Sequence, residues 1–148
     1  MDFTIENMRF EDALQTSLIE EECFTEPWSQ KAFEEEFENE LATILIARDV
    51  KSHNVIGFAN ARVLCGECYI NNIAVTASAR GKGIGKALLS SLIDSVRESA
   101  EFITLEVRAS NEIAQSLYKK LGFIQVGIRK NFYSKPTEDA LLMTKNLR

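Results

Sequence analysis

The segment with the clearest potential for chemistry is RGKGIGK at residues 80–86, which separates a predicted strand from a strongly periodic helix. Its alternating glycines let the backbone turn with several N–H groups on one side, and the helix that follows adds partial positive charge at its first turn. Arg80, Lys82 and Lys86 add full positive charges. These features predict a seat for a phosphate-bearing ligand. The alternative is a glycine-rich turn that binds nothing.

The spacing of these glycines excludes two common phosphate-binding loops. A dinucleotide fingerprint needs a glycine three residues after a Gly-x-Gly pair, and this chain has Lys86 or Leu88 at that place. A P-loop needs four residues between its glycines and a Ser or Thr after its lysine. Here three residues separate Gly81 from Gly85, and Ala87 follows the lysine. The ligand is therefore not expected to be bound by either of these loops.

The remaining residue types argue against metal and nucleophile chemistry. Cys65 and Cys68 form a CxxC pair, but a zinc ribbon needs a second pair, and only Cys23 and His53 remain. A turn between two strands, centred on Gly66, explains the pair better. With a single histidine, neither a Ser/His/Asp triad nor an HExxH metal site is expected. Any catalysis must use carboxylates, phenols, amines and backbone groups, without a metal.

The composition is that of one compact domain. The chain has 148 residues, of which 45% are hydrophobic and 26% are charged, and this fits a single domain over residues 1–148. The N-terminus lacks the basic and apolar regions of a signal peptide, and no apolar run approaches the length of a membrane span. We therefore expect a cytoplasmic protein with reduced cysteines and no membrane partner.

The charge balance also limits the partners. A net charge of −5 argues against direct binding of nucleic acid. Residues 20–40 nevertheless hold nine acidic side chains against one base, Lys31. This acidic stretch is either a pair of solvated helix faces or a rim that attracts a cationic partner.

Hydrophobic periodicity predicts an α/β fold with a mixed, mostly antiparallel sheet and about four helices, in the order β-α-α-β-β-β-α-β-α-β-β. The first helix pattern is amphipathic, and Phe33 and Phe37 share one face of the second helix. Ser29 and Asn111 are placed to cap helices, and Gly122 stands where a left-handed C-cap is needed. The predicted strands are Phe3–Ile5, Ala42–Arg48, Val55–Leu64, Cys68–Val75, Phe102–Val107, Phe123–Gly127 and Ala140–Thr144, with helices over about 11–24, after Pro27, over 84–96 and from Asn111 to Gly122, and a polar loop over 134–139.

Several runs of this sequence carry a resemblance to a known family. The glycine segment fits the acetyl-CoA loop of the GCN5-related N-acetyltransferases (GNAT), whose pattern is Gln/Arg-x-x-Gly-x-Gly/Ala. Five other runs, spread in order over nearly the whole chain, resemble the RimI-type ribosomal-protein-alanine N-acetyltransferases. The loop reads Arg80-Gly81-Lys82-Gly83-Ile84-Gly85, and the other runs are PWS at 27–29, NIAV at 72–75, LEVRASN at 105–111, AQSLYKKLG at 114–122, and NFY at 131–133 followed by EDA at 138–140.

The resemblance implies a single-domain GNAT fold with acetyl-CoA as co-substrate. The sheet would be splayed between the strand ending at Val75 and the strand ending at Val107, with the pantetheine arm in the gap. Ile73 and Val75 would offer backbone groups to the pantetheine and the thioester. Residues 80–86 would cradle the pyrophosphate, and Asn111 would also contact the cofactor.

The resemblance also implies the catalytic and acceptor-binding residues. Glu106 would accept the proton of the amine and Tyr118 would donate one, while Trp28 and Tyr133 would line the acceptor slot. Each residue has another interpretation. Glu106 shares a strand face with Arg108 and could form a structural ion pair. Tyr118 lies on an apolar stripe and could be a core residue, and the two loop aromatics could pack locally.

The activity that the resemblance implies is N-terminal acetylation of a small-subunit ribosomal protein that begins with alanine. The acidic stretch at residues 20–40 would suit a basic protein N-terminus as the acceptor. Two alternatives stay open. One is an acetyltransferase with another acceptor, either a protein lysine or a small amine. The other is a non-catalytic module that only binds acyl-CoA.

Overall fold

The computed structural model describes residues 1–148 and confirms the predicted order of helices and strands. Two short 3-10 turns, at Phe10–Asp12 and Ala77–Ala79, accompany the main elements. The strands are β1 (Phe3–Asn7), β2 (Ala42–Asp49), β3 (Val55–Leu64), β4 (Glu67–Val75), β5 (Phe102–Arg108), β6 (Ile124–Tyr133) and β7 (Glu138–Asn146), and the helices are α1 (Ala13–Cys23), α2 (Gln30–Phe37), α3 (Ile84–Val96) and α4 (Glu112–Lys120).

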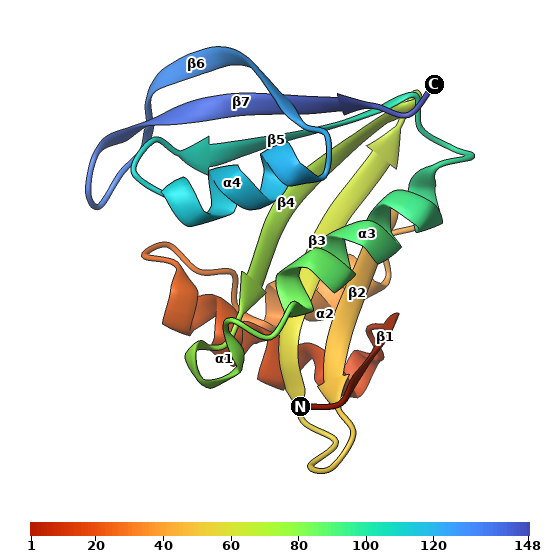
Figure 1. Ribbon diagram of the computed structural model, residues 1–148. Helices are drawn as coiled ribbons and strands as arrows, with labels where there is room; N and C mark the ends of the chain where they lie inside the picture. Colours follow the sequence, from red (N-terminus) through yellow and green to blue (C-terminus); the bar gives the residue numbers. More distant parts are fainter.

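All seven strands form one sheet in the order β1-β2-β3-β4-β5-β7-β6. Only β4 and β5 pair in parallel, while the other neighbours are antiparallel. Helix α3 crosses one face of β2, β3 and β4, and α1 and α2 lie behind the sheet in Figure 1. The predicted mixed, mostly antiparallel sheet is therefore confirmed.

The sheet is splayed at its centre, as expected. Strand β4 pairs with β5 only over Glu67–Tyr69, opposite Phe102–Thr104. Beyond these residues the two strands diverge, and Figure 1 shows them meeting near the C-terminus and separating toward the start of α3. The result is two half-sheets, β1–β4 and β5–β7, which are hydrogen-bonded to each other at one end only.

A β-bulge marks the point where β4 leaves β5. The register between β3 and β4 shifts by one residue at Asn71, which has no partner on β3. Ile70 and Ile73 both pack against the core beneath α3 although they are three positions apart. The two residues between them, Asn71 and Asn72, therefore both face the other side of the sheet. A bulge of this kind bends the strand and re-aims its side chains.

Local signals in the sequence account for the helix ends. Ser29 Oγ accepts a hydrogen bond from Ala32 N at 3.1 Å, and Asn111 Oδ1 accepts one from Ala114 N at 3.1 Å. Both bonds satisfy N–H groups that have no acceptor within their own helix. Gly122 follows α4 with φ of 94°, so the predicted left-handed C-cap is confirmed.

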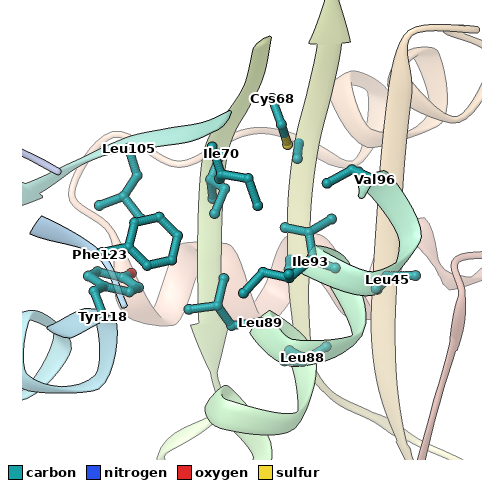
Figure 2. Packing of buried hydrophobic residues seen from close by; sticks show 14 of the residues in the cluster. Leu45, Cys68, Ile70, Leu88, Leu89, Ile93, Val96, Leu105, Tyr118 and Phe123 are labelled. Atoms are coloured by element: carbon teal, nitrogen blue, oxygen red, sulfur yellow. The ribbon is translucent and has the colours of Figure 1, made fainter. Parts of the chain in front are cut away.

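Two hydrophobic clusters hold the helices on the sheet. The larger cluster joins the apolar stripe of α3 to β2, β3 and β4, and extends to α4 through Tyr118 and Phe123 (Figure 2). The smaller cluster joins α1 and α2 to the opposite face. Its centre is the pair Phe33 and Phe58, whose ring centroids lie 5.4 Å apart.

The prediction that the first helix is amphipathic is wrong. Leu14 and Leu18 of α1 are about half exposed, whereas Thr16, Ser17 and Glu20 are buried. The hydroxyl groups of Thr16 and Ser17 donate to backbone carbonyls one turn earlier in the chain. The buried polar groups therefore have partners that hydrophobic periodicity does not reveal.

Two other predictions are wrong, one at the last residue of α2 and one at the end of β6. Phe33 is fully buried, but Phe37, at the last residue of α2, is 42% exposed and packs edge-on against Phe10. Strand β6 runs on to Tyr133 instead of ending at Gly127, and β7 begins at Glu138 instead of Ala140, so the polar loop is two residues shorter than predicted. Because β6 is an edge strand that pairs only with β7, its exposed second half needs no apolar alternation.

The CxxC segment forms the expected turn between β3 and β4. Cys65 and Gly66 have φ of 52° and 80°, as a two-residue hairpin turn with left-handed central residues requires. Cys65 is exposed and Cys68 is buried in the core. No helix of the structure is both long and apolar enough to cross a membrane.

The smaller core gives a test of the fold. Replacing Phe33 by Ala should lower the free energy of unfolding by about 3–5 kcal/mol, because the ring is fully buried between Trp28 and Phe58. Phe37→Ala, in the same helix, should lower it by about 1 kcal/mol or less. Urea unfolding followed by circular dichroism measures both values. Equal losses in the two variants would contradict this packing.

Candidate active site

A cavity of about 420 Å³ lies between β4 and β5 where the strands diverge. Four parts of the chain line it: the end of α1 with the loop that follows, β4 around its bulge, β5 with the start of α4, and the end of β6. The cavity brings together six of the residues predicted to form a site, which are Trp28, Ile73, Glu106, Asn111, Tyr118 and Tyr133.

The backbone of β4 directs groups toward this gap that have no partner strand. Thr76 N donates to Ile56 O at 2.9 Å, so the backbone N–H of Thr76 faces β3. Since backbone groups alternate along a strand, Ile73 and Val75 direct their N–H and C=O groups away from β3. Strand β5 no longer pairs with β4 at these residues. Both predicted backbone contacts are thus on the open edge of β4.

The glycine loop has the geometry of an anion seat. Gly81 and Gly83 have φ of 77° and 81°, and a Cβ atom at either residue would meet nothing within 4 Å. The first backbone acceptor of α3 is Gly83 O, which accepts from Ala87 N at 3.0 Å. The N–H groups of residues 84–86 therefore lack acceptors within the helix. They point out of the helix start beside Lys82, which is exposed.

The loop adjoins one end of the cavity. A Cβ atom on Gly85 would lie 3.4 Å from Leu117 Cδ2 and 4.0 Å from Val75 Cγ2, so α3 begins against both α4 and the end of β4. Arg80 donates from Nε to Val75 O at 3.0 Å and from Nη2 to Cys23 Sγ at 3.2 Å. Cys23 itself lines the cavity. The guanidinium thus ties the loop to the cavity wall.

Glu106 is held from both half-sheets. Its Oε2 accepts a hydrogen bond from the hydroxyl of Tyr69 on β4, and its Oε1 lies 3.1 Å from Arg129 Nε on β6. The carboxylate side chain is only 5% exposed. Burial, and then the bond to Glu106, raise the pKa of Tyr69, so this phenol keeps its proton and remains a donor. The expected ion pair exists, but its partner is Arg129 and not Arg108.

Arg108 instead orders the aromatic end of β6. Its guanidinium pairs with Glu138 at 3.1 Å and lies 4.4 Å from the centroid of the Tyr133 ring. Burial, and then the charge of Glu106, raise the pKa of Tyr133 to about 12. Tyr133 is therefore a neutral phenol on the cavity wall.

Tyr118 combines two of the expected features. Its ring packs against Phe123 with 5.8 Å between centroids and belongs to the larger core, as the apolar stripe of α4 predicts (Figure 2). The same residue lines the cavity. Burial raises the pKa of Tyr118 above its ordinary value, so the phenol is protonated at neutral pH.

Trp28 and Asn111 also have structural contacts besides their place on the cavity wall. The Trp28 ring packs 5.4 Å from Phe33, and Asn111 caps α4 through its side-chain oxygen. These contacts fix both side chains before any ligand binds.

No sequence pattern predicted Tyr69, Arg129 or Glu20 as residues of the site. Tyr69 and Arg129 hold the two oxygens of Glu106, and Arg129 lies in the part of β6 beyond Gly127, where no strand was predicted. Glu20 of α1 is 2% exposed, and its Oε2 accepts from Trp28 N at 3.0 Å and from Asn72 Nδ2 at 2.9 Å. A glutamate within a run of glutamates gives no signal of such burial.

A splayed mixed sheet, free backbone groups along one edge of the gap, and a glycine turn at a helix start beside it define a coenzyme A-dependent acyltransferase. The chain belongs to the acetyltransferase (GNAT) family, whose sequence profile matches residues 14–123. It is an N-acetyltransferase, as the curated relatives of this family are.

Individual relatives agree with this assignment. The chain is 37% identical to the ribosomal protein bS18-alanine N-acetyltransferase of Haemophilus influenzae, over 84% of this chain and 86% of that protein. It is 35% identical to the enzyme of that name from Escherichia coli K12, over 95% of both chains. A crystal structure of the Escherichia coli ribosomal-protein-alanine N-acetyltransferase superposes with a TM-score of 0.89 and 32% identity, covering 99% of this chain and 94% of that one. The resemblance to the RimI-type enzymes is confirmed.

The burial of Glu20 predicts a dependence of stability on pH. Burial raises the pKa of this carboxyl above its ordinary value of 4.5, so the folded protein binds the proton more tightly than the unfolded chain. The contribution of Glu20 to the free energy of unfolding is therefore lost as the pH rises from 4.5 through the raised pKa.

Glu20→Gln removes this titration. The stability of the variant relative to the parent protein should increase as the pH rises from 4.5 through the raised pKa and then become constant. Urea unfolding across this range measures the difference. Glu67→Gln, at an exposed position, is the control and should show no such trend. A pH-independent difference for Glu20→Gln would contradict the raised pKa.

Proposed function

We propose that this chain transfers the acetyl group of acetyl-CoA to the N-terminal alanine of ribosomal protein bS18 in the cytoplasm. One observation carries the proposal: Glu106 of β5 and Tyr118 of α4 line one cavity, along the open edge of β4. The acceptor is supported by the names of relatives that are 35–37% identical over most of this chain.

The residues along the gap fit acetyl-CoA. The open edge of β4 offers the N–H and C=O groups of Ile73 and the N–H of Val75 to the amides of the pantetheine arm, while the C=O of Val75 accepts from Arg80. The glycine turn and the free N–H groups of residues 84–86 suit the pyrophosphate, with Lys82 and Lys86 adding charge. We place Asn111 beside the cofactor at the start of α4, where it lines the cavity. Arg80 attaches the glycine loop to the cavity wall through its hydrogen bonds to Val75 O and Cys23 Sγ.

Glu106 is the proposed proton acceptor. An α-amine with a pKa of about 7.7–8.0 is mostly protonated at neutral pH and must lose a proton before its nitrogen can attack. The carboxylate of Glu106, fixed by Tyr69 and Arg129, takes that proton directly or through water. The nitrogen then forms a bond to the thioester carbonyl carbon, and a backbone N–H near Val75 stabilises the oxygen that becomes negative.

Tyr118 is the proposed proton donor. When the tetrahedral intermediate collapses, the carbon–sulfur bond breaks and leaves a thiolate, whose pKa is about 8.5 by analogy with cysteine. The protonated phenol of Tyr118 gives the thiolate a proton. The nitrogen still carries two hydrogens and loses one of them to the resulting phenolate, so that the product amide and the free thiol result. Because Glu106 and Tyr118 have fixed positions on one cavity, proximity and orientation also contribute to the rate.

The acceptor slot lies between Trp28 and Tyr133. Part of the acidic stretch is structural, because Glu20 is buried and Glu36 forms an ion pair with Arg62 at 2.7 Å. The exposed remainder would attract a basic N-terminus toward the slot. It includes Glu21, Glu26, Glu35, Glu38 and Glu40.

The test compares Glu106→Gln with the parent enzyme. With acetyl-CoA and a peptide carrying the first residues of bS18, kcat should fall by about 100-fold or more, as expected for a lost general base. The dissociation constant for acetyl-CoA should be nearly unchanged. Thiol release and titration calorimetry measure the two quantities, and Glu67→Gln is the matched control that should alter neither.

Three outcomes would contradict the proposal. Loss of acetyl-CoA binding in Glu106→Gln would make this residue structural. No thiol release by the parent enzyme with any amine would indicate a module that only binds acyl-CoA. Faster turnover with a polyamine, or with a peptide whose α-amine is blocked and whose lysine is free, would indicate another acceptor.

A further inference from the structure

One wall of the cavity holds buried polar atoms without hydrogen-bond partners. They are Glu20 Oε1, Asn71 Nδ2 and Asn72 Oδ1, and all three residues line the cavity. Nearly all buried polar groups in proteins are paired, so each unpaired one requires an explanation. Three of them on one wall indicate a surface that receives its partners from a ligand.

The protein itself fixes the positions of these atoms. Glu20 Oε2 accepts from Asn72 Nδ2 at 2.9 Å and from Trp28 N at 3.0 Å, so the carboxylate cannot turn freely. Because the amide nitrogen of Asn72 is directed to Glu20, its oxygen remains as a second free acceptor beside Glu20 Oε1. These contacts connect α1, the loop after it, and β4.

The bulge in β4 adds a donor to the two acceptors. In a regular strand, consecutive side chains point to opposite faces. Since Ile70 and Ile73 both face the core under α3, Asn71 and Asn72 share the other face, where Glu20 lies. The wall therefore offers two acceptor atoms and the Nδ2 donor of Asn71.

This set of atoms complements the first residue of a peptide. A neutral primary amine has two N–H groups and one lone pair. Its two N–H groups match Glu20 Oε1 and Asn72 Oδ1, which leaves the lone pair free to attack the thioester. The first peptide carbonyl then accepts from Asn71 Nδ2. A lysine side-chain amine or a polyamine has no carbonyl two bonds from its nitrogen.

We propose that Glu20, Asn71 and Asn72 bind the backbone of the acceptor's first residue and thereby select α-amines over side-chain amines. This inference rests on the proposed function, since it requires an acceptor with a free N-terminal amine. Glu106 and Glu26 are the other carboxylates on the cavity wall. Glu106 receives the third proton of the incoming ammonium group, as proposed above.

The experiment pairs a change in the protein with a change in the peptide. One acceptor is a peptide that begins with alanine. The other is the same peptide with its first peptide bond replaced by a trans carbon–carbon double bond, which removes the carbonyl and leaves the amine. Asn71→Ala should lower kcat/KM for the first peptide by about tenfold, the loss expected for one hydrogen bond. It should leave kcat/KM for the second peptide unchanged.

Two further variants test binding of the amine by Glu20 and the donor group of Asn71 at the bulge. Glu20→Gln places an amide group where the free acceptor was, so it should lower kcat/KM for both peptides, because both carry the amine. Asn71→Asp keeps the shape of the side chain but replaces the donor by oxygen, and it should lose at least as much as Asn71→Ala with the first peptide only. Neither variant at Asn71 should alter the KM for acetyl-CoA.

Asn60→Ala is the matched control. Asn60 lies opposite Asn72 on β3, and both polar atoms of its side chain are also buried and unpaired. It does not line the cavity. The control should leave the ratio of kcat/KM for the two peptides unchanged, whereas a general effect of buried asparagines would shift it as in Asn71→Ala.

The outcomes separate this inference from the function on which it rests. If the parent enzyme acetylates the alanine peptide but both Asn71 variants affect the two peptides equally, or affect neither, the inference is overturned and the proposed function stands. If the parent enzyme binds acetyl-CoA but acetylates no alanine peptide, the proposed function fails and the inference fails with it. A loss confined to the normal peptide supports both.

Discussion

The structure depends on the early end of hydrogen bonding between β4 and β5. These strands pair over three residues each and then separate, which leaves backbone groups of β4 without a partner strand. Unpaired backbone groups in a protein interior are costly unless another group meets them. The gap is therefore stable only because both half-sheets have their own packing, under α3 on one side and against β7 and α4 on the other. A ligand with amide groups is the natural partner for the open edge.

The same separation brings chemistry from both half-sheets together. Glu106 belongs to β5, yet its oxygens are held by Tyr69 from β4 and Arg129 from β6. Tyr118 reaches the cavity from α4, which packs on the second half-sheet. The bulge at Asn71 sits at the divergence and turns two consecutive side chains to the acceptor side. One local irregularity in pairing thus determines both where the co-substrate lies and which groups face the amine.

Sequence reasoning succeeded where the determinant is local. The bounds of β3 and α3 are as predicted, and the caps at Ser29, Asn111 and Gly122 are confirmed, because each depends on a few neighbouring residues. The glycine spacing and the family runs led to the family that the comparisons establish.

What could not be predicted depends on contacts between distant parts of the chain. The extent of β6 is set by β7, and with it the ion pair between Arg129 and Glu106. The burial of Glu20 depends on Asn72, 52 positions away, and on the shape of the loop at Trp28. The orientation of α1 follows from such polar contacts and not from its hydrophobic pattern.

Amide hydrogen exchange on the parent enzyme, with and without saturating acetyl-CoA, shows whether the open edge of β4 binds the co-substrate. Exchange should slow at Ile73 and Val75 when acetyl-CoA binds, whereas Asn72 and Ala74, whose N–H groups face β3, should be slow in both states. Binding of acetyl-CoA by calorimetry with no change in exchange at Ile73 and Val75 would contradict binding of the co-substrate at this edge.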